Sequence, residues 1–247
     1  MANWSDPRPT AAPFGAARGA AGAAYDQGLR SYMLRVYNYM ASGVLLTGIV
    51  ALAFAFSGYV SLLFNPVTGG ATPLGWVVML APIGIVFAMS FGQMRMQTGT
   101  LKALFWAYAA LMGLSLSTVF LAYTGTSVAG AFFAAAAGFA GLSLYGYTTK
   151  RDLSAFGTFF IIGLVGLLVA MIIAIWVPAM NPLISIVGVL LFAGLTAYDT
   201  QRTKSLYFQA AGIGQVERVV VMSALQLYLD FINMFLFVLR LFGNGRN

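Results

Sequence analysis

Two acidic residues, Asp199 and Asp230, occur inside long apolar stretches, in the segments GLTAYDTQ and LYLDFINMF. A charged aspartate at the centre of a membrane-spanning helix costs about 2.5–3.5 kcal/mol on insertion scales. Such residues normally face the interior of a helix bundle and have partners. If the two carboxyl groups meet in a poorly hydrated site, they cannot easily both stay ionised, and they titrate as a coupled pair. The predicted chemistry is proton sensing or transient binding of a cation such as calcium, which prefers oxygen ligands.

Helical spacing places further polar residues beside Asp230. Ser223, Gln226, Asp230 and Asn233 are separated by three, four and three residues, so they form one stripe on a helix. This stripe is expected to line the bundle interior or a pore. Asp199 belongs to the preceding apolar segment, and consecutive helices joined by a short link are usually neighbours. It is expected about half a dozen residues nearer the membrane surface than Asp230, so contact requires some adjustment of register.

A nearby cation would oppose the sharing of a proton by the two aspartates. Arg95, at the end of the second apolar segment in SFGQMR, is the candidate gating partner for an ionised Asp199. In the alternative interpretation, the acid pair only fastens two helices together through hydrogen bonds. Asp152 and Ser154 are assigned a structural role, capping the free N–H groups where the fifth apolar segment begins.

The composition requires a membrane environment for these residues. Hydrophobic residues make up 60% of the chain and charged residues 8%, with a mean hydropathy of +0.86. Soluble domains contain roughly a quarter charged residues. Apolar runs of about twenty residues, the length that crosses a bilayer core, recur along the chain. They predict an all-α polytopic membrane protein with seven transmembrane helices, at about residues 36–57, 75–91, 103–123, 127–147, 156–177, 183–203 and 219–242.

The basic residues predict how the bundle is oriented. The first-to-second, third-to-fourth and fifth-to-sixth links contain no Lys or Arg, whereas the other links and the amino-terminal tail hold all basic residues except Arg240 and Arg246. The positive-inside rule makes the basic side, including the amino terminus, cytoplasmic. Residues 1–28, rich in Ala, Gly and Pro, are predicted to form a disordered cytoplasmic tail, and residues 29–247 the seven-helix domain.

Several function classes are excluded by what the sequence lacks. It contains no Cys and no His, which removes disulfides, thiolate or imidazole metal sites and His-based catalysis. It also has no nucleophile-plus-base set and no glycine-rich phosphate loop with its Lys. We therefore expect a protein that is not an enzyme and has no cofactor. The net charge of +7 is explained by membrane orientation rather than by nucleic-acid binding.

Three segments resemble the Bax inhibitor-1 family, also called the transmembrane BAX inhibitor motif family. They are KRDLS followed by Gly157, AYDTQ at residues 197–201, and LYLDFINMFLFVLRLFG at residues 227–243. The resemblance covers the chain from about residue 30 to its end. The long tail rich in Ala, Gly and Pro and the absence of His favour a bacterial member, located in the inner membrane. The resemblance implies a fold in which six helices surround a central seventh, and an aspartate pair, here Asp199 and Asp230, that senses pH near a cytoplasmic gate. Arg95 matches the family's FxxMR context, although Met96 and Gln97 replace the run of Arg that follows it in channel-like members.

Two functions of different classes follow from this resemblance. The first is a pH-sensitive calcium or other cation leak channel, in which ionised Asp199 holds Arg95 and protonation frees the second helix. The second is an interaction protein that modulates a membrane-anchored ATP-dependent protease or another stress-response partner. The first makes the aspartate pair essential, whereas the second places the important surface on the tail and on the lipid-facing helices.

Overall fold

The fold is a bundle of long helices. A computed structural model describes residues 14–65, 70–212 and 214–245, apart from the side chains of residues 14–26. Within this part, β-type pairing is confined to two isolated bridges, and seven helical segments are long and apolar enough to cross a membrane, as the sequence predicts. The α-helices are α1 (Phe14–Phe56), α2 (Pro73–Gly92), α3 (Thr98–Leu116), α4 (Val119–Ala122), α5 (Gly125–Thr148), α6 (Gly157–Ile173), α7 (Asn181–Gly212) and α8 (Val216–Phe242). Short 3₁₀ turns are η1 (Tyr59–Leu62), η2 (Ser154–Phe156) and η3 (Pro178–Met180).

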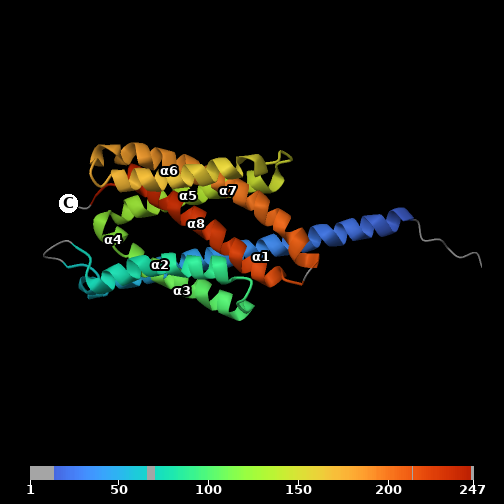
Figure 1. Ribbon diagram of the computed structural model, residues 1–247, viewed down its shortest axis with the longest axis horizontal. Coiled ribbons are helices and arrows are strands. Elements are labelled where there is room, and N and C mark those ends of the chain that lie inside the picture. The colour runs from blue at the N-terminus through green and yellow to red at the C-terminus, as the bar shows by residue number, and fades with distance from the viewer. Residues whose placement is uncertain (1–13, 66–69, 213, 246–247) are drawn as a thin grey trace, which may run out of the picture.

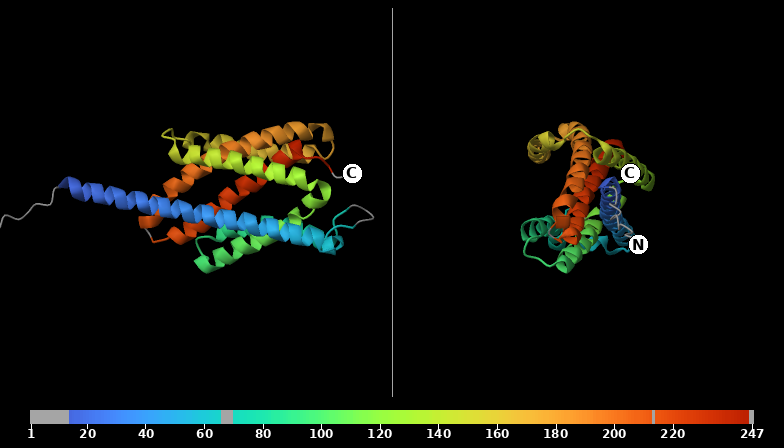
Figure 2. Two further views of the ribbon diagram at one scale, coloured as in Figure 1. Left: turned by 180° about the vertical axis from the view of Figure 1, so that it is seen from behind. Right: turned by 90° about the vertical axis from the view of Figure 1, so that its right-hand side faces the viewer.

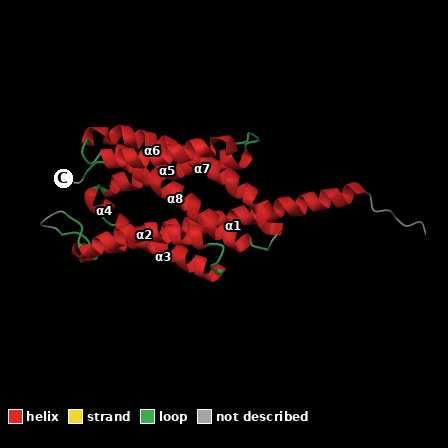
Figure 3. Cartoon of the chain, in the orientation of Figure 1, coloured by secondary structure: helices red, strands yellow, loops and turns green. Residues whose placement is uncertain are grey.

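The spanning helices form two groups of three with α8 between them (Figure 1; Figure 3). One group contains α1, α2 and α3, which α4 extends; the other contains α5, α6 and α7. In the most apolar window of α8, 67% of the residues are buried, against 17–33% in the other six spans. The predicted arrangement of six helices around a central seventh is therefore confirmed.

Aromatic packing and one polar tie hold α8 against the α1–α3 group. The Tyr228 ring meets Phe105 and Tyr108 edge to face, with centroids 6.2 and 5.3 Å apart. Its hydroxyl lies 2.7 Å from Thr47 Oγ1, which in turn donates to the carbonyl oxygen of Ala109 at 2.8 Å. Tyr228 is fully buried, so this partner satisfies a phenol that would otherwise stand unpaired in an apolar core.

The predicted disordered tail is partly wrong. Residues 1–13 lie outside the described part of the chain, but residues 14–28 form the first turns of α1. Alanine has the highest helix propensity of all residues, and this stretch repeats it at AARGAAGAA. The helix consequently extends beyond the rest of the bundle at its amino-terminal end (Figure 2).

Helix α7 also differs from the sequence-based expectation. The sixth apolar segment was expected at residues 183–203, whereas the helix continues to Gly212. Hydropathy falls after Asp199 because Arg202 and Lys204 follow, yet nothing there ends a helix before Gly212 and Gly214. The last turns of α7 therefore leave the apolar region without any break in the helix.

The links that carry the basic residues share one end of the bundle, which we call the basic end. The α2–α3, α5–α6 and α7–α8 links lie there together with the amino-terminal part of α1 (Figure 1). The assignment of this end to the cytoplasm stays a prediction.

A close approach between backbones sets the position of α7 against α5. A Cβ atom on Gly146 would lie 2.2 Å from the carbonyl oxygen of Ala197, so only glycine allows the two helices this separation. Small residues at such crossings are the usual means by which membrane helices pack closely. Ala197 stands two residues before Asp199, and the crossing therefore helps to place that aspartate.

Replacing Gly146 by leucine is expected to force α5 away from α7. The cost should be about 1–3 kcal/mol, as for other overpacked cores, and should lower the thermal unfolding midpoint of the purified protein in detergent. Gly141→Leu is the matched control on the same helix, because a Cβ there meets no atom within 4 Å. Equal midpoints for the two variants would contradict this account.

Candidate functional site

The carboxyl groups of Asp199 on α7 and Asp230 on α8 lie within hydrogen-bonding reach of each other. The register gap expected from the sequence does not exist, because it rested on a shorter sixth helix. Asp199 lies 13 residues before the end of α7 at Gly212, and Asp230 lies 14 residues after the start of α8 at Val216. At 1.5 Å per residue, both stand about 20 Å from the link between the two helices.

The pair is enclosed in the bundle and has few donors. Asp199 is 2% exposed and Asp230 is 4% exposed. The side-chain amide of Gln226, one turn before Asp230 on the exposed side of α8, donates to Asp199 Oδ2 at 3.1 Å. Asp199 Oδ1 and Asp230 Oδ2 have no hydrogen-bond partner among the described residues. Two carboxyl groups this close repel each other when both are ionised, and a proton on one of them allows a hydrogen bond between them.

The predicted ion pair between Asp199 and Arg95 is absent from the described part of the structure. Arg95 lies exposed on the turn between α2 and α3, whereas Asp199 is enclosed between α7 and α8. The cation that interacts electrostatically with Asp199 is instead Arg202, three residues further along α7. The motif context of Arg95 gave its position along the second helix but not its distance from the sixth.

The predicted polar stripe of α8 divides into buried and exposed members. Ser223 is buried, with its hydroxyl 3.3 Å from that of Tyr32, while Gln226 faces the outside of the bundle. Asn233 is half-buried and donates to the carbonyl oxygen of Leu229 in its own helix at 2.8 Å. Of the three, only Gln226 contacts an aspartate of the pair.

The segment AYDTQ directs successive side chains to different parts of the protein. Tyr198 packs on the start of α6, where its ring centroid lies 5.7 Å from that of Phe160. Thr200 reaches α5, with its hydroxyl 3.0 Å from Ser143 Oγ, and Ser143 continues to Tyr37 on α1 at 2.6 Å. Asp199, between Tyr198 and Thr200, meets α8.

Gln201 joins the AYDTQ segment of α7 to the KRDLS segment at residues 150–154. Its amide oxygen accepts from the Leu153 backbone N–H and its amide nitrogen donates to the Arg151 carbonyl, both at 2.8 Å. In the same loop, Asp152 Oδ1 accepts from the Ser154 N–H at 2.9 Å. Among the described residues, no side chain caps η2 or α6, so the predicted capping of the fifth span is wrong. Hydrogen bonds from the side chain and the backbone N–H of Ser154 lower the pKa of Asp152. The sequence analysis missed Gln201 because an amide near a predicted membrane surface carries no signal of its own.

A second polar cluster at the basic end also escaped prediction. Glu217, in the first turn of α8, pairs with Arg35 on α1 and with Lys102 on α3, the latter at 2.9 Å. The three side chains are 35–45% exposed, so each pair contributes about 0–1 kcal/mol. The available signal was that Glu217 is the one acidic residue in the whole sixth-to-seventh link.

The chemistry open to the aspartate pair is proton exchange and weak cation contact. Within the described residues, no three acidic, His or Cys side chains come together as they do in a dedicated metal site. Two carboxylates and neighbouring amide oxygens fall short of the six to eight oxygens that calcium takes in stable sites. The predicted transient calcium contact at Asp199 and Asp230 stays a prediction.

Seven spanning helices around a buried carboxyl pair define a polytopic helical membrane protein with an acid pair inside its bundle. The chain belongs to the Bax inhibitor-1 family, because the family model described as "Inhibitor of apoptosis-promoting Bax1" matches residues 29–247. The resemblance seen in the three motifs is thereby confirmed.

Relatives occur in several bacteria. A Caulobacter vibrioides protein is 44% identical over 228 residues, which cover 90% of this chain and 91% of the relative. The Rickettsia prowazekii protein RP147 is 43% identical over 228 residues, covering 90% and 93% of the two chains. Inner membrane protein YbhL of Escherichia coli is 41% identical over 224 residues, covering 89% and 94%. The similarity thus extends over nearly the whole bundle.

Replacing Gln226 by leucine is expected to destabilise the bundle. The change removes the donor to buried Asp199, and an unpaired buried acceptor costs about 1–3 kcal/mol. The thermal unfolding midpoint in detergent measures the effect. Asn233→Leu is the matched control, because the amide of Asn233 bonds to its own helix and the same change there leaves both carboxyls untouched. A drop no larger than that of the control would show that the Gln226 contact contributes nothing.

Proposed function

We propose that this protein is a passive cation pathway, with calcium as its principal ion, across the bacterial inner membrane. In this proposal, protonation of the Asp199–Asp230 pair controls the flow, and the basic end faces the cytoplasm. The bacterial relatives, the inner-membrane location given in the name of YbhL and the placement of the basic residues support the location and the orientation. The control by protons is supported by the geometry of the pair.

The observation that carries the proposal is the close approach of two buried carboxyl groups. A shared proton holds α7 against α8 at the centre of the bundle. Loss of that proton leaves two negative charges in contact in a medium of low dielectric constant, where repulsion is strong. The contact between the two helices therefore depends on pH, and α8 is the helix on which α1, α3, α5 and α7 pack.

Two carboxyl oxygens without a hydrogen-bond donor support a divalent cation as the cargo. Asp199 Oδ1 and Asp230 Oδ2 lack a donor within the described residues, so a cation that replaces the shared proton gains two carboxylate ligands. Such a site is too poor in ligands to retain calcium tightly. Weak binding suits a pathway, because an ion must leave its site as readily as it enters.

The double variant Asp199→Asn, Asp230→Asn is expected to lose the pH response of ion flux. Asparagine keeps the size and hydrogen-bonding capacity of aspartate but cannot release a proton in this range. Purified protein is reconstituted into liposomes loaded with a calcium dye, and the initial rate of calcium entry is measured from pH 6 to pH 8. A double variant that keeps the normal pH response would rule out the pair as the sensor.

Two control variants separate the pair from other charges. Asp152→Asn removes a carboxylate whose lowered pKa keeps it ionised throughout the assay, so the pH response should not change. Arg95→Gln should also leave the response intact, because Arg95 does not contact Asp199 in this conformation. If Arg95→Gln abolished the response, Arg95 would have to reach the pair in another conformation, as the motif comparison suggested.

The alternative function, restraint of a membrane protease or another stress-response protein, makes a different demand on the chain. It predicts that deletion of residues 1–28 removes a partner from affinity purifications, while the double asparagine variant retains it. Flux in liposomes that contain no other protein distinguishes the two functions, because an interaction protein has no reason to pass ions alone.

A further inference from the structure

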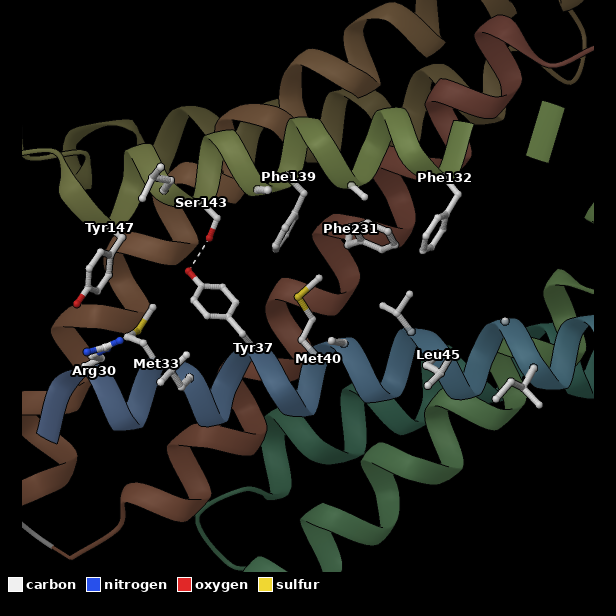
Figure 4. A pocket seen from close by; sticks show the side chains of 18 of the residues that line it. Arg30, Met33, Tyr37, Met40, Leu45, Phe132, Phe139, Ser143, Tyr147 and Phe231 are labelled. Atoms are coloured by element: carbon white, nitrogen blue, oxygen red, sulfur yellow. Dashed lines mark hydrogen bonds between the residues drawn. The ribbon is translucent and has the colours of Figure 1, made fainter. Parts of the chain in front are cut away.

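A groove of about 950 Å³ runs between α1 and α5 on the side of the bundle away from the α2 and α6 helices (Figure 2; Figure 4). Helix α1 packs on α3 and α8, and α5 packs on α7 and α8, so the two flank α8 without closing over it. Phe231 of α8 lines the groove between them (Figure 4). Leu45 and Leu144, both more than 60% exposed, stand at its edges. The groove is thus a lipid-facing opening that reaches the central helix.

The polar atoms of the groove are unevenly placed. Arg30 and Tyr147 line it at one end, near the basic end of the bundle, while Phe132 and Leu45 line the other (Figure 4). Tyr37 and Ser143 bond to each other at 2.6 Å, which satisfies both hydroxyls within the protein. The groove is therefore polar at one end and apolar along the rest of its length.

One positive charge, Arg30, lines the polar end, and a second, Lys204, lies beside the lining residue Tyr147. Arg30 is exposed and forms no ion pair with any carboxylate whose side chain the structure describes. Lys204 of α7 lies beside Tyr147: its Nζ donates to the Tyr147 carbonyl at 2.9 Å and stands 4.9 Å from the ring centroid. A carbonyl and an aromatic ring attract a cation but do not neutralise it. Neither cation has a carboxylate partner among the side chains that the structure describes.

We propose that the groove binds one anionic phospholipid from the leaflet at the basic end. The phosphate head group contacts Arg30 and Lys204, and an acyl chain runs over the Tyr37 ring towards Leu45. Hydrocarbon that faces a groove open to the bilayer fills it, because an empty groove forfeits the dispersion contacts of its walls. The two cations select the head group, since anionic lipids are attracted to clustered Lys and Arg at a membrane surface.

The dimensions agree with this occupant. Arg30 and Leu45 are 15 residues apart on one helix, or about 22 Å, which is enough for a head group and one acyl chain. Bound in this way, the acyl chain covers Phe231, which adjoins Asp230 in the sequence of α8. The lipid then adds to the Tyr37–Ser143 hydrogen bond, which joins α1 to α5 over the central helix.

Lipid retention by the purified full chain tests the proposal. Native mass spectrometry measures binding of phosphatidylglycerol and of phosphatidylcholine with the same acyl chains. Two variants remove parts of the site: Arg30→Gln removes head-group charge, and Gly48→Phe fills the groove. A Cβ atom on Gly48 meets nothing within 4 Å, so the added ring enters the groove rather than displacing a neighbour.

Each variant has a matched control outside the groove. Arg95→Gln removes an exposed arginine at the same end of the bundle, and Gly166→Phe adds a ring at an exposed glycine of α6 with equal free space. Circular dichroism and gel filtration show whether each variant is folded. If Gly48→Phe does not fold, Ala140→Phe fills the groove from α5 instead.

The expected result is one phosphatidylglycerol retained in preference to phosphatidylcholine. Loss of one surface cation should weaken it about fivefold in Arg30→Gln, and Gly48→Phe should abolish it, with both controls unchanged. Equal retention of the two lipids, or equal effects of Arg30→Gln and Arg95→Gln, would overturn the proposal. Appearance of a dimer that Gly48→Phe dissociates would also overturn it, because a second copy of the chain would then occupy the groove.

Discussion

The contact between two carboxyl groups at the centre of the bundle constrains nearly every other feature of this protein. Aspartate is costly inside a membrane, and Asp199 and Asp230 reduce that cost by facing each other across α7 and α8. The contact requires both helices to place an acid at the same depth, which the long α7 achieves by continuing to Gly212. In the same part of α7, Gly146 permits a close approach to α5. The two acids thus meet beside the most buried helix of the bundle.

The pentapeptide at residues 197–201 connects the aspartate contact to the helices and the loop around α7. Successive side chains of a helix point about 100° apart, so five neighbouring residues cover the full circumference. Here each direction is occupied: Tyr198 meets α6, Asp199 meets α8, Thr200 meets α5, and Gln201 holds the loop before η2. A movement of α7 that alters the aspartate contact consequently disturbs three other contacts.

Composition and charge placement were sufficient to predict the seven spans and the class of fold, because hydropathy over twenty residues is a strong signal. The two aspartates were identified for the same reason, since an acid inside such a span is exceptional. Which side chains contact the aspartates could not be predicted from the sequence. Arg95 stands in a matching motif but lies away from Asp199, and Gln226, expected as one member of a stripe, turned out to bind the acid. The end of α7 was misplaced because hydropathy records where a helix leaves the bilayer and not where its backbone stops. The alanine-rich stretch before residue 29 was misjudged because low apolar content does not prevent an alanine helix.

The buried position of α8 has a consequence for how the molecule is made. Ribosomes synthesise a chain from its amino terminus, so the six outer helices enter the membrane before the helix at their centre exists. During that interval, Tyr32, Thr47 and Asp199 lack the partners that α8 later supplies. When α8 is inserted, Asp230 packs against Asp199 on α7. Only three residues, 213–215, link the two helices. Assembly of this bundle is therefore completed only when its most buried helix is in place.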